Sequence, residues 1–405
     1  MSYIQPRAYE HAVRREMIHR IRGIVSTLWR DADVRVFGSF AAEMYLPTSD
    51  IDLVVISSSF AQHGIPRYSQ KASLWKLGAA LRGSGIVKPG SLKMIAGAKV
   101  PIVKFVDVDT NLNVDISFEN SSGLIANETF IRWKAEHPAM PILVFVIKQF
   151  LAMRGLNEVY IGGLGSFALT CMVVSMLQQL PSLSSGRVDG RLNTGVMLLE
   201  FLELYGKNFN TEKIGICVDS SRPGYFRKDS FPSQISRGPV EPSLLCIQDP
   251  NKPDNDISRS SYLIKLVMSC WADAHDDIIE QMGKLDRCEF EDRENRSILG
   301  VIIGGNYQLI EAQRELMKEV YIRRIGQEED IELEERVLYG VDLSNPRENP
   351  SPRDAIHTYS DKRSQKKNRK KGKRNNRLHG NSQGDLGSRI SMHQKGGANE
   401  PIIID

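Results

Sequence analysis

Three aspartates are spaced in a way that suits metal-dependent phosphoryl transfer. Asp50 and Asp52 stand two residues apart at the head of a predicted strand, so both side chains point to one face. Two neighbouring carboxylates repel each other and do not both stay ionised unless a cation lies between them. Asp115 lies between Val114 and Ile116 in a second predicted strand, where a buried, unpaired acid is costly. Together the three acids predict a site for two Mg²⁺ ions, with Mn²⁺ as a substitute.

A glycine and a serine precede these acids at a place suited to phosphate binding. Gly38 and Ser39 follow the predicted strand Val34–Phe37 and precede a predicted helix start. A turn there would direct backbone N–H groups at a phosphate, with the serine hydroxyl assisting. A Gly-Ser pair alone could be an ordinary turn, and an Asp-x-Asp pair alone could be a solvated strand end. The prediction of a metal and phosphate site therefore depends on the two motifs occurring together.

These residues need a small sheet to hold them, and the chain predicts one. Apolar, β-branched runs alternate with one helix at about 68–82 and predict the strands Val34–Phe37, Ile51–Ser57, Ser91–Ala96, Val100–Val106 and Leu112–Phe118. A predicted helix over 8–30 precedes them, with apolar residues near a 3.6-residue period. We therefore expect a mixed-sheet domain over 31–121, with the helix in 1–30 packing on the domain that follows.

The rest of the folded chain is predicted to be mainly helical. Periodic apolar segments predict helices at 122–135, 139–154, 166–180, 194–206, 260–274, 274–286 and 305–324. Between them, 208–258 is rich in Pro and Gly and is expected to be loop-like, with a short hairpin near 213–227. The expected fold class is therefore α+β, with a small mixed-sheet domain and a larger helical domain over 122–325.

Composition and charge set the context of these domains. The chain has 405 residues, of which 41% are hydrophobic and 25% charged, as expected for roughly two globular domains. We expect an acidic segment at 326–343 and a disordered basic tail at 344–405, whose run at 366–377 is a phosphate-binding arm, a nuclear localisation signal or a solvated tail. The longest apolar helical stretch, Ala168–Leu177, is too short for a membrane span, so no membrane association is expected.

In order and spacing, these motifs resemble the nuclear Trf-type poly(A) polymerases of the DNA polymerase β-like nucleotidyltransferase superfamily. The run G-S, then D-I-D-L and L-N-V-D-I-S, is similar to the catalytic domain, and 247–262 resembles the nucleotide recognition motif. Gly162–Phe167 and Val146–Leu151 resemble helical-domain signatures of the same family. The resemblance covers about residues 10–325. It implies a palm-like catalytic domain, a helical central domain and an active site in the cleft between them.

The resemblance assigns nucleotide contacts to four further residues. Lys148 matches a ligand of the triphosphate, and Ser166 matches a hydroxyl that reaches phosphate. Phe167 matches a ring that stacks on the base, and Asn127 matches a residue that holds the ribose hydroxyls. The sequence alone is equally compatible with a surface lysine, a helix N-cap and a core phenylalanine at the first three positions.

Base choice is expected to depend on the segment Asp249–Arg259. Uridylate-adding relatives have a histidine where this chain has Asn255, which is followed by Asp256. Asparagine is smaller and presents both a donor and an acceptor, which favours adenine. Asp256 and Arg259 have the alternative role of an ion pair that braces the loop.

The resemblance therefore implies a template-independent RNA 3′-adenylyltransferase that uses ATP in nuclear or nucleolar RNA processing, surveillance and decay. The implied partners are an RNA 3′ end and, as in complexes of the TRAMP type, a zinc-knuckle RNA-binding protein and an RNA helicase. Three alternatives stay open. They are uridylyl or mixed A/G addition, nucleotidyl transfer to a small molecule or protein, and a non-catalytic scaffold for RNA processing.

Overall fold

The computed structural model describes residues 3–68, 71–98, 100–219, 221–230, 244–289, 293 and 296–326. These residues all belong to one of the two units of the chain, Met1–Leu338. The expected basic tail, and the expected acidic segment apart from Gly326, lie outside them.

A mixed sheet with the strand order β1-β2-β5-β4-β3 holds the aspartates. The strands are β1 (Ala32–Phe37), β2 (Ile51–Ser57), β3 (Lys93–Ile95), β4 (Ile102–Val106) and β5 (Asn113–Phe118). Neighbours are antiparallel except for β2 and β5, which are parallel. Two short helices flank β2, namely α2 (Gly38–Ala41) before it and α3 (Ser58–His63) after it. The mixed sheet predicted from the sequence is confirmed.

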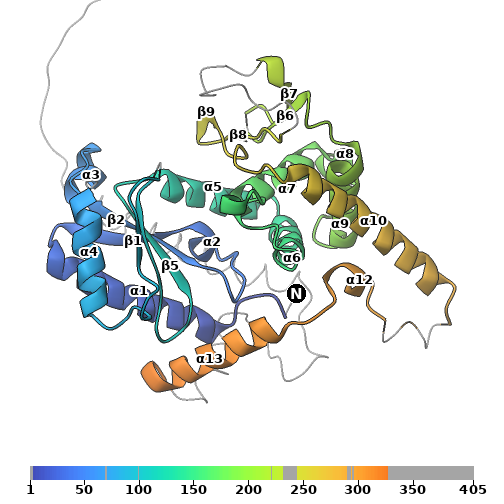
Figure 1. Cartoon of the computed structure of the whole chain (residues 1–405). Coiled ribbons are helices and arrows are strands. Elements are labelled where there is room, and N and C mark those ends of the chain that lie inside the picture. Colours follow the sequence, from blue (N-terminus) through green and yellow to red (C-terminus); the bar gives the residue numbers. More distant parts are fainter. Residues whose placement is uncertain are drawn as a thin grey trace, which may run out of the picture. The chain divides into compact units, whose positions relative to one another are not determined.

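The first described helix packs on this sheet, and the last packs on the first. α1 (Ala8–Leu28) lies beside α13 (Gln308–Arg324), and α4 (Lys71–Gly83) contacts α1 and two of the strands (Figure 1). Their buried apolar side chains share one cluster with the strands, among them Met17, Ile21, Leu77, Met317 and Tyr321. The expectation that the N-terminal helix packs on the helical domain is wrong, because the sheet covers its apolar stripe. α13 follows the helical domain in the chain but belongs to the sheet domain by its packing.

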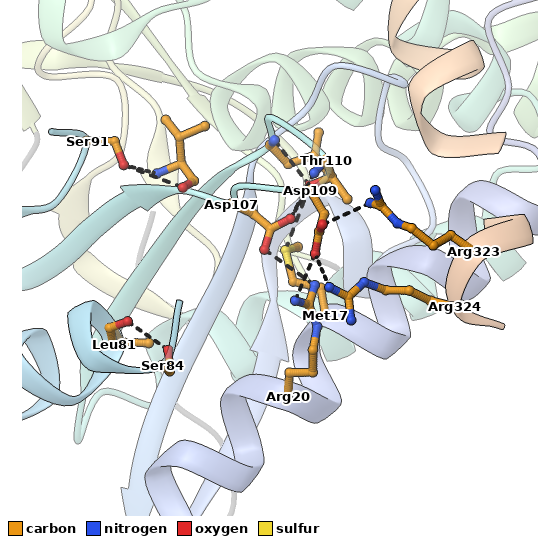
Figure 2. A network of polar contacts seen from close by, with 12 residues as sticks. Met17, Arg20, Leu81, Ser84, Ser91, Asp107, Asp109, Thr110, Arg323 and Arg324 are labelled. Carbon is orange, nitrogen blue, oxygen red and sulfur yellow. Dashed lines mark hydrogen bonds and ion pairs between the residues drawn. The ribbon is translucent and has the colours of Figure 1, made fainter. Parts of the chain in front are cut away.

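A cluster of charged residues ties these helices to the turn between β4 and β5 (Figure 2). The carboxylate of Asp109 lies 3.1 Å from Arg20 of α1, and 2.9 and 2.7 Å from Arg323 and Arg324 of α13. Asp107, which is fully buried, lies 3.4 Å from Arg20. One acidic turn therefore holds two helices that are about 300 residues apart in sequence.

The helical domain is built around α6 and α7, which are almost wholly buried. Its helices are α5 (Ser122–Glu136), α6 (Met140–Ala152), α7 (Ser166–Gln179), α8 (Pro181–Ser184), α9 (Thr194–Glu203), α10 (Ile264–Asp286) and α12 (Gly300–Ile303). The sequence predicted two helices over 260–286, but α10 is continuous. Trp271, Ala274 and Ile278 keep one buried face through the expected break, and no proline interrupts it.

Two small hairpins complete this part of the chain. β6 (Ile214–Cys217) pairs with β7 (Gly224–Arg227), which confirms the hairpin predicted near 213–227. β8 (Gln248–Asp249) pairs with β9 (Lys252–Asp256), inside a segment that was expected to be loop-like. Within the described residues, no helix combines the length and the apolar character that a membrane crossing requires.

Candidate active site

The three aspartates lie together in the lining of one large cavity. β2 and β5 are parallel, and their register places Asp52 directly opposite Asp115. Asp50 immediately precedes β2, and all three residues line a cavity of about 1010 Å³. The cavity volume is at the upper end of the range typical of small-molecule sites, so it has room for more than one substrate group.

Buried polar contacts position the loop that carries Asp50. Arg14 of α1 is fully buried and donates to the backbone carbonyls of Pro47 and Ser49, at 2.9 Å each. The side chain of Asn113 donates to Oδ1 of Asp50 at 3.1 Å. Arg14 of α1 and Asn113 of β5 thus fix the loop that carries Asp50. The packing of α1 on the sheet is what brings Arg14 to this loop.

Lys104, which the sequence analysis did not single out, is the cation that faces these acids. It lies opposite Asp115 in the β4–β5 register, and its Nζ is 3.2 Å from both carboxylate oxygens of Asp115 and 3.4 Å from Asp50. Burial lowers the pKa of Lys104, but Asp115 and Asp50 outweigh it and the net shift is upward. The sequence shows a lysine inside the apolar run 102–106, but its position opposite Asp115 follows only from the β4–β5 register.

Two of the aspartates are still harder to ionise than usual in spite of this lysine. Burial, followed by the charges of Asp115 and Asp50, raises the pKa of Asp52 to about 7. Burial also raises the pKa of Asp115 above its ordinary value, against the opposing charge of Lys104. A site that raises the pKa values of two carboxylates favours binding of additional positive charge.

The carboxylate oxygens of the three aspartates are suitable ligands for Mg²⁺, although the side chains are not yet close enough to bind one ion together. Oδ1 of Asp115 is buried and accepts no hydrogen bond from the described residues, and its charged contact is the ion pair with Lys104, so it becomes an oxygen ligand when that lysine moves. Mg²⁺ prefers carboxylate oxygens and keeps several waters, and therefore needs few protein ligands. Among the described residues, no group of three or more His, Cys, Asp or Glu side chains is close enough to hold a metal ion as it stands. Lys104 instead bridges Asp50 and Asp115.

The Gly38–Ser39 turn lies against the acids. Gly38 has φ +73°, and a Cβ built on it would be 2.2 Å from Oδ2 of Asp52. Glycine is therefore required twice here, for the left-handed backbone and for the close approach of Asp52. Ser39 lines the large cavity, as expected of a phosphate contact.

A second cavity of about 220 Å³ meets the large one at four residues. The residues that line both cavities are Ser39, Asp52, Lys148 and Ser166. Phe167 lines only the smaller cavity, where its ring contacts Phe130 edge to face, with centroids 5.4 Å apart.

The two polar residues from the helical domain reach this junction in different ways. Lys148 is 8% exposed, and its ammonium donates to the carbonyl of Met44 at 2.9 Å. Burial lowers the pKa of Lys148 to about 8, although Asp52 opposes the shift. A surface position for Lys148 is thereby ruled out. Ser166 is the first residue of α7, and Gly165 is its N-cap, so Ser166 is not the cap.

Asn127 lies on α5, outside the lining of both cavities. Its side-chain nitrogen donates to the carbonyl of Val36 at 3.4 Å, and its Oδ1 is buried without a hydrogen-bond partner in the described structure. The nearby Thr129 donates to Asn251 at 2.7 Å and ties α5 to the β8–β9 hairpin.

The residues expected to read the base do not line either cavity. Asn255 donates to Asp249 at 3.0 Å across the hairpin. Asp256 accepts from the backbone of Ile247 and from Ser258, so it braces the hairpin through these partners. Arg259 also lies outside the lining of the two cavities. The wider recognition motif at 247–262 nevertheless reaches the large cavity through Ser260 and Tyr262. Both lie beyond Arg259, and the sequence analysis did not single them out.

Comparisons with family models agree with both parts of this architecture. Residues 1–133 match the model described as "Poly(A) RNA polymerase, mitochondrial-like, central palm domain". Residues 193–255 match the model described as "Cid1 family poly A polymerase".

Individual proteins and one solved structure are similar over a longer stretch. Poly(A) RNA polymerase protein 2 of Saccharomyces cerevisiae is 37% identical over 75% of this chain and 50% of its own length. Poly(A) RNA polymerase cid14 of Schizosaccharomyces pombe is 40% identical over 70% of this chain and 40% of its own length. The chain thus spans about half or less of these relatives. The polymerase core of TRAMP, an RNA surveillance complex, is 36% identical with a TM-score of 0.66, and the match covers 74% of this chain and 90% of that one.

Proposed function

The chain belongs to the poly(A) RNA polymerase family of nucleotidyltransferases, and on that premise we propose that it adds AMP from ATP to RNA 3′ ends without a template. The observation that carries the proposal is the junction of the two cavities. There an acidic strand end, a glycine turn and a buried lysine meet. Such a junction suits a reaction in which two substrates approach one phosphorus atom from different sides.

Each group at the junction has a part in the reaction. Ser39, Lys148 and Ser166 bind the triphosphate, which a compact ammonium and two hydroxyls suit. Phe167 and the smaller cavity hold the base. The RNA 3′-hydroxyl enters from the large cavity and gives its proton to Asp115, and its oxygen attacks the α-phosphorus of ATP. The bond from that phosphorus to the β-phosphate oxygen breaks, and pyrophosphate leaves.

Asp50, Asp52 and Asp115 are the residues that would hold Mg²⁺, once Lys104 moves from between them. When bound, Mg²⁺ neutralises the carboxylates and the phosphates and lowers the pKa of the attacking hydroxyl. The protein's own contribution is position and charge, which account for most of the catalysis in phosphoryl transfer.

We further propose that the protein acts in nuclear RNA surveillance with a zinc-knuckle RNA-binding protein and an RNA helicase. The likeness to the polymerase core of an RNA surveillance complex supports this setting. The basic run at 366–377 would add a salt-dependent attraction for RNA phosphates.

Primer extension tests the proposal. Full-length protein, labelled RNA ending in adenosines, Mg²⁺ and each NTP in turn should give a ladder with ATP and little with UTP, CTP or GTP. The Asp50→Ala/Asp52→Ala double variant should give none, and Trp75→Ala, an exposed aromatic on α4, should extend like the wild type. Strong UTP or mixed A/G ladders would favour the alternative specificities. No ladder with any NTP, even with a zinc-knuckle partner added, would favour a scaffold.

A further inference from the structure

Two exposed tyrosines line the large cavity. Tyr160 is 82% exposed and Tyr262 is 59% exposed, and both line this cavity but not the smaller one. Single exposed apolar residues are ordinary on a protein surface, but two aromatic rings at the rim of one polar cavity suggest a binding role.

The backbone at both tyrosines is fixed by hydrogen bonds or close packing. Tyr160 lies in the 3₁₀ turn Val159–Ile161, which is closed by hydrogen bonds from Gly162 to the carbonyl of Val159 and from Gly163 to the carbonyl of Glu158, the residue before the turn. Gly162 has φ +90°, and a Cβ there would be 2.3 Å from two atoms of the Tyr262 ring. The Tyr262 ring therefore packs directly on the Gly162 backbone, while most of its surface stays open.

The backbone also couples the two rings to each other. Leu263, next to Tyr262, donates to the carbonyl of Gly162 at 2.9 Å, and so joins the end of the recognition segment to the turn that carries Tyr160. The two tyrosines are thus placed by a single hydrogen-bonded unit. Tyrosine side chains on a fixed backbone lose little conformational freedom when they bind a flat partner, because each has only two side-chain torsions.

A flat, uncharged partner is what this part of the cavity can accept. Its lining includes Glu158 beside Asn157, and Glu158 is close enough to Asp115 to raise the pKa of that acid, so a phosphate group placed directly beside these two acids would be repelled. A nucleobase stacks on aromatic rings whatever its identity, and its edge can bond to an amide and a carboxylate.

Building on the proposed function, we infer that Tyr160 and Tyr262 form the subsite for the 3′-terminal base of the RNA that is extended. With ATP occupying the junction and the smaller cavity, the large cavity is left for the RNA end. A stacked terminal base would present its ribose 3′-hydroxyl to Asp115. The rings thereby select for a free 3′ end without reading its sequence.

Equilibrium binding tests the subsite without requiring catalysis. The Kd of the full-length protein is measured by fluorescence anisotropy in EDTA, without ATP. The probes are a 5′-labelled oligoadenylate and the same RNA with an abasic 3′-terminal nucleotide. Both RNAs have the same backbone charge, so the basic run contributes equally to each. The wild type should bind the intact RNA about 10-fold more tightly than the abasic RNA.

Tyr160→Ala and Tyr262→Ala should each weaken binding of the intact RNA about 5- to 10-fold and so remove most of the preference over the abasic RNA. Tyr→Phe at either position, and Trp75→Ala as an equally exposed aromatic control, should keep it. In primer extension the two alanine variants should raise KM for RNA and leave KM for ATP unchanged.

Three results would overturn the inference. These are a wild type with no preference for the intact end, alanine variants that keep the preference, and variants that raise KM for ATP instead. The proposed function fails separately. A tyrosine-dependent preference in a protein that extends no RNA would leave the subsite standing and refute the polymerase activity.

Discussion

Replacing Gly38 by alanine should inactivate the site by moving Asp52. The new Cβ would be 2.2 Å from Oδ2 of Asp52, whereas ordinary contact begins near 3.4 Å. The carboxylate is the free end of a short side chain, so it can rotate away by about 1 Å. The strand that carries Asp52 should therefore stay folded. A misplacement of about 1 Å in a reacting group costs about 100-fold in rate.

Gly64 provides a matched control for the backbone part of this effect. It also has a left-handed φ, +69°, but a Cβ there meets nothing within 4 Å. Both substitutions should cost about 1–2 kcal/mol of stability from the left-handed backbone, and only Gly38→Ala should lower kcat. Thermal melts and kcat for ATP addition to an RNA primer separate the two effects. A Gly38→Ala protein with a kcat within about threefold of Gly64→Ala would refute the reasoning.

Three further changes test other parts of the structure. Asp52→Asn should stabilise the metal-free protein near pH 8 by at most about 4 kcal/mol, because the folded-state pKa of about 7 lies above the ordinary 3.8. Wild-type stability is lost as the pH rises from about 4 through 7, so the stability gain of Asp52→Asn over the wild type should vanish near pH 4. A variant and a wild type with equal melting temperatures at pH 8 as well as at pH 4 would contradict this. Lys104→Gln should tighten Mg²⁺ binding several-fold in calorimetry, because the ammonium no longer competes between Asp50 and Asp115; weaker binding would show that Lys104 supports the ion. Asp109→Asn should lower stability by about 1–2 kcal/mol through its three arginine contacts, whereas Asp33→Asn, an exposed pair, should change little.

Local patterns were sufficient to predict most elements of this fold, apart from the continuity of α10 and the β8–β9 hairpin. The strands around Asp52 and Asp115 follow from β-branched runs, and the helices of the central domain follow from their apolar period. The packing partners of α1 and α13 could not be predicted in the same way. An apolar stripe shows that a helix is covered, and the covering surface lies hundreds of residues away in sequence.

The site was predicted unevenly for a similar reason. The aspartates and the glycine turn are close in sequence or share a strand pattern, so their convergence could be predicted. Lys104 reaches the site only through the β4–β5 register, which no local pattern gives. Asn255 belongs to the expected motif, yet its side chain bonds to Asp249 in a hairpin outside both cavity linings. A motif locates a segment, but the pairing of its backbone decides which side chains reach the site.

The position of α13 has a consequence for how the protein is made. Met317, Val320 and Tyr321, all on α13, belong to the apolar cluster that contains the catalytic strands. A ribosome that has released the first 121 residues has therefore released all three aspartates, but not the core that holds them in place. During synthesis, which proceeds from the N-terminus, the helical domain has to emerge before the sheet domain can close. A truncated product that stops before α13 would carry every catalytic side chain and still lack a finished active site.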